Sequence, residues 1–353
     1  MEYPSVKKSH IVPRGYLRNF AVDRQVAMRL VGESESRLVA LRDAGTRPRF
    51  YRRTPPDGTP IDDVEWSLGH IEDKAAPLLR EIEGQWPLST ENKATLAEFF
   101  GFQLVRGPGW RAWHTAQVDN SLEELRRKGV PALGIAGGSS DAERFVDELR
   151  GDLSEDTETL KRMLSQGPKG ACVLGSMHWS LVRFDRPLIA TSDHPVVVWP
   201  RHCRSMRAAS TGLRQGILET LEVRVPVSPR LVLLMTWLWD EDSPSILRGR
   251  KHHAPNVNTL TVANADRQWF HLPETSPPLL DVSFLPISRD LLPAYRADHA
   301  AHSPRREEAR ALAEPTIGQE LATRYRMLTV SRPTAAHGVW TPGEGGQNPS
   351  RPS

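Results

Sequence analysis

The chain has 353 residues, of which 39% are hydrophobic and 25% charged, a composition that suits a folded protein with a real core. Its formal net charge of +3 is too small to argue for a nucleic-acid partner, because bulk charge bears on solubility and weak association only. Two cysteines exclude a disulfide framework, and no apolar run is long enough for a transmembrane helix, so we expect a cytoplasmic protein.

The first elements along the chain are short strands. Residues 25–31 and 37–41 favour a β-hairpin, because two β-favouring runs flank a Gly-Glu-Ser turn. Paired prolines and an Asp-Gly step then interrupt regular structure over residues 49–60.

A helical region follows. Apolar residues three or four apart predict a helix over residues 62–84, which Pro77 should kink. A second helix is expected over residues 87–106, with Ser89 or Thr90 as its N-cap. Further helices are expected over residues 110–129, 141–151, 155–166 and 174–184, with a linker at 130–140.

The later part of the chain favours strands. Runs rich in Val, Leu and Ile predict strands within residues 187–200, 221–238 and 279–287, and residues 254–271 favour one more helix. We therefore expect an α+β fold, with a mostly helical N-terminal half packed against a β-rich C-terminal half. Residues 1–290 are expected to form a single globular domain, residues 291–330 a peripheral helical segment, and residues 331–353 a disordered tail.

Polar residues on the two long helices form the first group of candidates. Gln103 and Arg106 lie one helical turn apart, so together they could bind a carboxylate or phosphate. Alternatively, Arg106 interacts with the last carbonyls of its own helix. Glu65 and Glu72 are two turns apart and could hold a cation or exchange protons, or they could belong to a solvated acidic face.

Two further residues stand at the ends of apolar segments. His10 could be a general base or a metal ligand, or it could orient the N-terminal segment through hydrogen bonds. Asp193 follows an apolar strand, where catalytic carboxylates are often placed, although an Asp near a Pro is also common in turns. The chain contains no nucleophile elbow, phosphate-binding loop or dinucleotide fingerprint.

Several ordered blocks resemble one known family. The stretches "HIVPRGYLRNF", "SLGHIEDKAAPLLREI", "FFGFQLVRGPGWR", "TSDHPVV" and "VPVSPRLVLL" are similar to blocks of the bacterial family named domain of unknown function 4238. Asn258 and Arg267 stand where the last helix of that family carries polar residues. In the block "TSDHPVV", His194 stands where the family pattern more often has Asn. The resemblance implies a shared fold from about His10 to His271, and it implies no particular activity.

Two hypotheses for function follow. The first is an enzyme, a hydrolase or nuclease acting on an anionic small molecule or nucleic acid, with a divalent metal as a compatible cofactor. Its catalytic residues would be His10, Asp193 and Glu72, and its substrate-binding residues Arg106, Gln103 and Asn258. The second is a non-catalytic binding or regulatory protein whose polar motif residues form a structural network. Convergence of the candidates around one cavity would favour the enzyme, and separate hydrogen bonds would favour the network.

Overall fold

The computed structural model describes residues 7–53, 61–153, 156–200, 220–237 and 246–280. It contains both helices and sheets, which confirms the α+β class. The helices are α1 (Arg14–Leu17), α2 (Asp63–Glu81), α3 (Thr90–Val105), α4 (Pro108–Lys128), α5 (Ser140–Leu153), α6 (Asp156–Ser176) and α8 (Ala254–Ala263), with 3-10 turns η1 (Arg18–Phe20), η2 (Pro131–Leu133) and η5 (Lys251–His253). The strands are β1 (Lys8–His10), β2 (Gln25–Leu30), β3 (Arg37–Ala40), β4 (Thr46–Pro48), β5 (Gly129–Val130), β6 (Ile135–Ala136), β7 (His178–Phe184), β8 (Thr191–Ser192), β9 (Val197–Pro200), β10 (Thr220–Ser228), β11 (Leu231–Thr236), β12 (Ile246–Gly249) and β13 (Gln268–His271).

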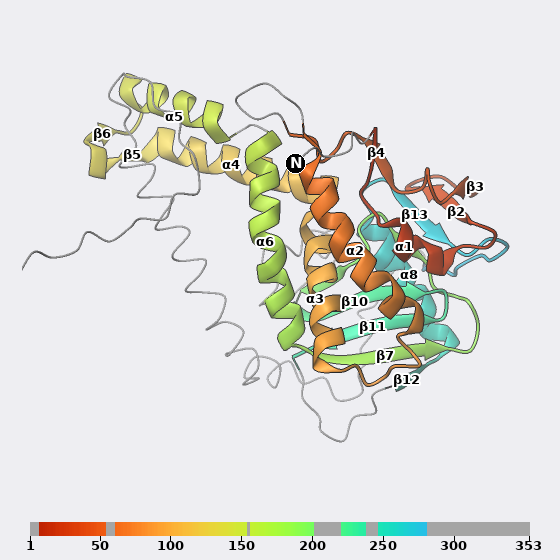
Figure 1. Ribbon diagram of the computed structural model, residues 1–353. Helices are drawn as coiled ribbons and strands as arrows, with labels where there is room; N and C mark the ends of the chain where they lie inside the picture. Colours follow the sequence, from red (N-terminus) through yellow and green to blue (C-terminus); the bar gives the residue numbers. More distant parts are fainter. Residues whose placement is uncertain (1–6, 54–60, 154–155, 201–219, 238–245, 281–353) are drawn as a thin grey trace, which may run out of the picture.

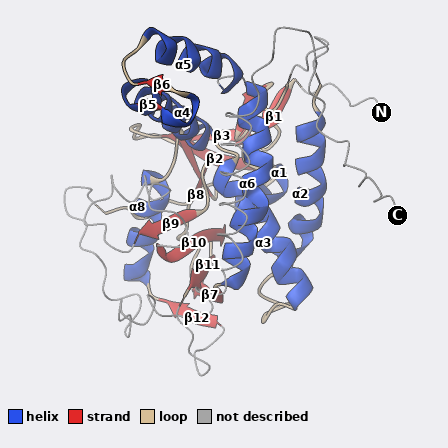
Figure 2. Cartoon of the chain, turned by 90° about the vertical axis from the view of Figure 1, so that its left-hand side faces the viewer, coloured by secondary structure: helices blue, strands red, loops and turns tan. Residues whose placement is uncertain are grey.

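A five-stranded sheet with the strand order β12-β7-β11-β10-β9 lies between two layers of helix (Figure 2). Its strands pair antiparallel, except that β12 runs parallel to β7. Helices α3 and α6 lie on one side of the sheet, here called the inner face, and α8 lies on the outer face. Alternate residues of the central strands enter two separate hydrophobic clusters, as the pleat requires. The inner cluster includes Leu181, Val223, Val225, Leu233 and Met235, and the outer one Val182, Phe184, Val232, Leu234, Ala254 and Val257.

Helices α3 and α6 approach each other closely at a glycine. A Cβ atom placed on Gly101 would lie 2.4 Å from the carbonyl oxygen of Gly167 and 2.6 Å from the backbone nitrogen of Ala171. These separations are far shorter than van der Waals contact, so only glycine permits this spacing of the two backbones.

A four-stranded antiparallel sheet, with the order β3-β2-β13-β8, brings strands from the first 40 residues next to strands from residues 191–271. The predicted hairpin of β2 and β3 is confirmed, and β13 pairs with β2 through Phe270 opposite Met28. The expected division into a helical N-terminal half and a strand-rich C-terminal half was therefore too simple. Strands β1 to β4 all lie in the first 48 residues, and one of them, β2, pairs with β13 far along the chain, which local sequence patterns do not reveal.

The N-terminal segment docks on the helical layer. Tyr16, Leu17 and Phe20 are almost fully buried. The ring of Tyr16 lies 6.3 Å from that of Phe99 on α3, and its hydroxyl group bonds the side chain of Thr191 at 2.7 Å. Figure 1 shows α1 close to α2.

Two predicted helices were wrong in part. Residues 174–184 were expected to be one helix, but α6 ends at Ser176 and β7 follows. Trp179 and Leu181 of β7 enter the inner cluster while Val182 and Phe184 enter the outer one, and a strand buried on both faces lacks a clear alternation of polar and apolar residues.

The helix expected over residues 254–271 stops at Ala263, and residues 268–271 form β13. The side chain of Asn264, just after the helix, donates to the carbonyl oxygen of His194 at 2.8 Å. This tertiary contact holds the turn between the two elements. The linker expected over residues 130–140 also contains structure, the small hairpin of β5 and β6.

Helices α4 and α5 extend from the body as an arm, with β5 and β6 at its tip (Figure 1). Leu122, Val146 and Leu149 form a separate small hydrophobic cluster between these helices. Among the described residues, none of the helices combines the length and apolar character that crossing a membrane requires.

Several expectations concern residues outside the described ranges. These are the peripheral helical segment at 291–330, the disordered tail at 331–353, and most of the strand expected at 279–287.

Candidate functional site

Arg106 lies at the C-terminal end of α3 and is 2% exposed. Its Nε donates to the hydroxyl of Tyr51 at 2.9 Å, Nη1 to Oε1 of Glu72 at 2.7 Å, and Nη2 to the carbonyl oxygen of His10 at 2.6 Å. These four residues are called the Arg106 network below. Arg106 is thus buried, and Glu72 pairs with its charge.

Burial of Arg106 disfavours its charge, but Tyr51 and Glu72 outweigh burial and raise its pKa. Each member of the Arg106 network comes from a different element or loop: β1, the loop before α2, α2 itself and the end of α3. The guanidinium therefore ties the N-terminal strand and the loop to the helical layer.

His10 binds Arg106 through its backbone carbonyl and not through its ring. The backbone N–H of His10 donates to Oε1 of Glu65 at 3.3 Å. Burial, followed by the charges of Arg14 and Arg106, lowers the pKa of the His10 ring, whereas burial raises the pKa of Glu65. Nε2 of His10 and Oε2 of Glu65 are buried and have no hydrogen-bond partner among the described residues.

Gln103 lies one turn before Arg106, as its spacing predicts, and is 2% exposed. Both polar atoms of its side chain are buried without a hydrogen-bond partner in the described part of the chain. It makes no hydrogen bond to Arg106 there, and joint binding of an anion by these two side chains stays a prediction.

Asp193 follows β8 and binds backbone. Its carboxylate accepts the N–H groups of Asp266, Arg267 and Gln268 at 2.8, 2.9 and 3.0 Å, which fixes the loop that enters β13. Burial raises its pKa to about 6, although these three hydrogen bonds oppose the shift. Within the described residues it makes no hydrogen bond to the Arg106 network.

His194, the next residue, connects this loop to the helical layer. Its Nε2 lies 3.3 Å from the carbonyl oxygen of Leu104 on α3. Residues 193–194, here called the Asp193 turn, and the Arg106 network therefore both contact the C-terminal end of α3, without sharing a hydrogen bond in the described structure.

Asn258 also binds backbone groups. It is fully buried on α8, accepts from the N–H of Ala190 at 2.9 Å, and donates to the carbonyl oxygens of Leu188 and Pro278 at 2.8 and 3.0 Å. Its amide thus joins three chain segments. The site residues expected from the sequence lie in three sets: the Arg106 network with Gln103 and Glu65, the Asp193 turn, and the Asn258 junction.

The described residues contain no group of three or more His, Cys, Asp or Glu side chains placed to hold a metal ion. The divalent metal that the sequence allowed thus has no ligand set in that part of the chain.

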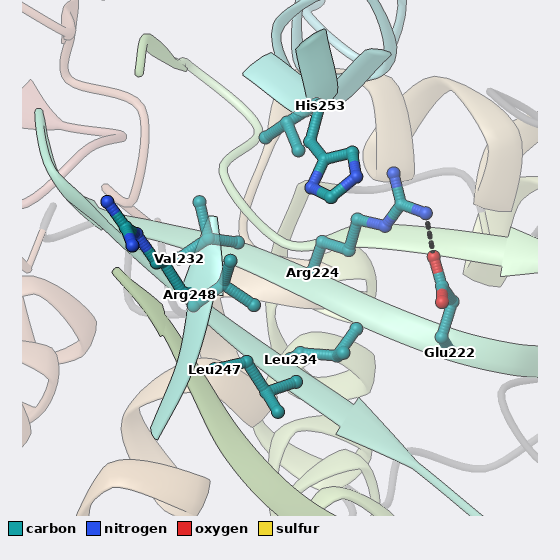
Figure 3. Close-up of a pocket in the computed structure, with 9 residues that line it drawn as sticks. Glu222, Arg224, Val232, Leu234, Leu247, Arg248 and His253 are labelled. Atoms are coloured by element: carbon teal, nitrogen blue, oxygen red, sulfur yellow. Dashed lines mark ion pairs between the residues drawn. The ribbon is translucent and has the colours of Figure 1, made fainter. Parts of the chain in front are cut away.

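A pocket that sequence reasoning missed lies on the outer face of the five-stranded sheet (Figure 3). The empty space in and around it, open solvent included, is about 470 Å³. Its lining is called the sheet pocket and consists of Val182, Glu222, Arg224, Val232, Leu234, Leu247, Arg248, His253 and Val257.

A buried ion pair forms one side of the sheet pocket. Glu222 and Arg224 are 3% and 7% exposed and bind each other, and Nη1 of Arg224 also donates to Oδ1 of Asn256 at 2.8 Å. His253 lies above this pair in Figure 3, and aliphatic side chains lie below it. One sequence signal was available: Glu222 and Arg224 alternate with valines in β10. Such alternation predicts a solvated face, but η5 and α8 cover this one.

The model of a family described as protein of unknown function (DUF4238) matches residues 8–275. Neither the curated proteins nor the solved structures contain a match to the chain.

Proposed function

Because the chain belongs to the DUF4238 family, whose description names no activity, we propose a function from the site itself: the protein binds a small molecule in the sheet pocket. The observation that carries this proposal is the ion pair of Glu222 and Arg224, which is buried beside an open, otherwise largely aliphatic pocket.

The chemistry of the lining supports ligand binding rather than a purely structural role. Taking two charges out of water is expensive, and hydrophobic residues of similar size would often be as stable. Beside a pocket, however, such a pair offers both a hydrogen-bond acceptor and a donor at fixed positions. Aliphatic walls with a few placed polar groups are typical of ligand sites.

In this proposal the Arg106 network is structural. Its guanidinium makes three hydrogen bonds to Tyr51, Glu72 and His10, and it is almost fully buried. The separation of Asp193 and Asn258 from this network supports the non-catalytic hypothesis of the two that the sequence allowed.

Blocking the pocket tests the proposal. Leu247 lines the sheet pocket, whereas its neighbour Ile246 on the same strand is 39% exposed and does not. We expect Leu247→Trp to abolish the binding of small molecules found by a thermal-shift screen and measured by calorimetry. Ile246→Trp serves as the matched control and should bind normally. Equal binding by both variants would place the ligand elsewhere and contradict the proposal.

One observation favours an enzyme as the second candidate. His10 has a lowered pKa and the adjacent Glu65 a raised one, and both lie next to Arg106. Acid–base pairs in hydrolases often have environments that move their pKa values in this way. A screen of phosphoesters and nucleic acids should then find an activity that His10→Gln abolishes while the exposed control His70→Gln retains it; failure to find hydrolysis by the wild type argues against this candidate.

A further inference from the structure

The edge of the sheet pocket is strongly basic. Nη2 of Arg248, a pocket residue on β12, donates to Oδ2 of Asp185 at 3.0 Å. Nη1 of Arg230, in the turn between β10 and β11, donates to the backbone carbonyl of the same aspartate at 2.6 Å. The pKa of Asp185 is lowered, first by Arg248 and then by the charges of Arg183 and Arg230. Asp185 therefore lies between Arg230 and Arg248, and the charge of Arg183 acts on it from the other face of β7.

The topology adds further cations at the same place. Strand β7 ends where β11 begins, and β12 runs parallel to β7, so the segments that follow β7 and β12 lie at one end of the sheet. These segments also expose Arg186, Arg250 and Lys251. Asp185 is paired with Arg248, whereas Glu83 is paired with Arg183 at 2.9 Å on the face of β7 that points away from the pocket. Positive charge therefore exceeds negative charge around the pocket mouth.

We propose that the ligand of the sheet pocket is an amphipathic anion, with an apolar body against the aliphatic walls and a phosphate or carboxylate group at Arg248. This inference rests on the proposed function, since it assumes that the pocket binds a ligand. Leu234 and Leu247 supply apolar contact between Arg248 at one end of the pocket and the pair of Glu222 and Arg224 at the other (Figure 3).

The charges at the two ends favour an anion over a cation. The carboxylate of Glu222 is already matched by Arg224, so it offers little net attraction to a cation. The side chain of Arg248 is 81% exposed in its pair with Asp185, and exposed ion pairs contribute little free energy. An incoming anion can therefore replace Asp185 at low cost, and the planar guanidinium suits two-pronged binding of phosphate or carboxylate.

Four probes with the same apolar chain separate these contributions: hexyl phosphate, hexanoate, hexan-1-ol and hexylammonium. We expect the wild-type protein to bind the two anions more tightly than the alcohol, and the ammonium compound least, in calorimetric titrations at low salt. Added salt should weaken the binding of hexyl phosphate and leave that of hexan-1-ol nearly unchanged.

Variants locate the anion. Arg248→Gln should weaken hexyl phosphate about fivefold at low salt and leave hexan-1-ol unchanged. Arg144→Gln on α5 is the matched control, because Arg144 is also exposed and paired with a carboxylate, that of Asp141. It should bind all four probes as the wild type does.

The outcomes separate the two proposals. Binding of hexan-1-ol as tight as that of hexyl phosphate, with no effect of Arg248→Gln, would overturn the anion and leave the pocket as a ligand site. Preference for hexylammonium would overturn the anion as well. Failure of all four probes to bind, or binding that Leu247→Trp leaves intact, would overturn the sheet pocket itself.

Discussion

Arg106 and Glu72 form an ion pair across α3 and α2, with 2.7 Å between Nη1 and Oε1, in which the arginine side chain is 2% exposed and the glutamate 21%. The pair is therefore asymmetric, since the glutamate keeps access to water while the arginine depends on its protein partners. Removing those partners, or replacing the planar guanidinium that binds all of them, should therefore mainly lower the free energy of unfolding.

The first prediction follows from this asymmetry. Arg106→Lys keeps the charge but cannot reach Tyr51, Glu72 and the carbonyl of His10 together, so we expect a loss of about 2–4 kcal/mol in the free energy of unfolding. Urea denaturation of the variant measures this loss. Arg144→Lys, at an exposed pair, should change stability by less than about 0.5 kcal/mol. A wild-type midpoint for Arg106→Lys would show that the network is not structural.

The second prediction concerns pH and Asp193. Its pKa is raised from 3.8 to about 6 in the folded protein, so the folded state binds the proton more tightly than the unfolded state. The corresponding stability is fully present below pH 4 and is lost as pH rises through about 6, by roughly 3 kcal/mol at about 1.4 kcal/mol per pKa unit.

Asp193→Asn cannot titrate at this position. We therefore expect the difference in unfolding free energy between wild type and variant to change by that amount between pH 4 and pH 7, in the direction that disfavours the wild type at higher pH. Parallel pH profiles for the two proteins would contradict the raised pKa.

The third prediction tests the docked N-terminal segment. Phe20 is fully buried, and Val22, two residues later, is 48% exposed. Phe20→Ala should destabilise the protein by about 3–5 kcal/mol, because it leaves a cavity in the main hydrophobic cluster. Val22→Ala should change the melting temperature little, and equal effects of the two substitutions would mean that the segment is not part of the core.

The fourth prediction uses the glycine contact between α3 and α6. Gly101→Ala would place Cβ 2.4 Å from a backbone oxygen that cannot move away without shifting a helix, so we expect low expression or a large loss of stability. Gly69 on α2 has nothing within 4 Å of an added Cβ. Gly69→Ala should therefore stabilise the protein by up to about 1 kcal/mol through helix propensity. Thermal denaturation of both variants checks this opposite pair of effects.

The sequence predicted the elements that local chemistry defines. The side chain of Ser89 caps α3 by accepting from the N–H of Asn92 at 3.2 Å, as the capping pattern indicates. Strand β7 was missed because both of its faces are buried, and the end of α8 was missed because Asn264 and Asp193 set it through distant contacts. Such contacts leave no periodic signal in the chain.

The candidate site residues also fall into those that local chemistry predicts and those that depend on distant contacts. The partnership of Arg106 with a carboxylate could be predicted, since a buried guanidinium requires one. The amide of Asn258 bonds backbone groups at a junction of three segments, and its role in substrate binding stays a prediction. The sheet pocket was not predictable from β10 alone, because burial of Glu222 and Arg224 depends on elements more than twenty residues later.

The tip of the arm formed by α4 and α5 is a suitable place for attaching the protein to a solid support. Because Leu122, Val146 and Leu149 form a cluster apart from the main core, changes near the tip should leave the body of the protein undisturbed. Gly134, in the turn between β5 and β6, has a positive φ of 70° and no atom within 4 Å of an added Cβ. An affinity tag inserted at this turn would immobilise the protein with the sheet pocket open, so that bound small molecules could be recovered from cell extracts and identified by mass spectrometry.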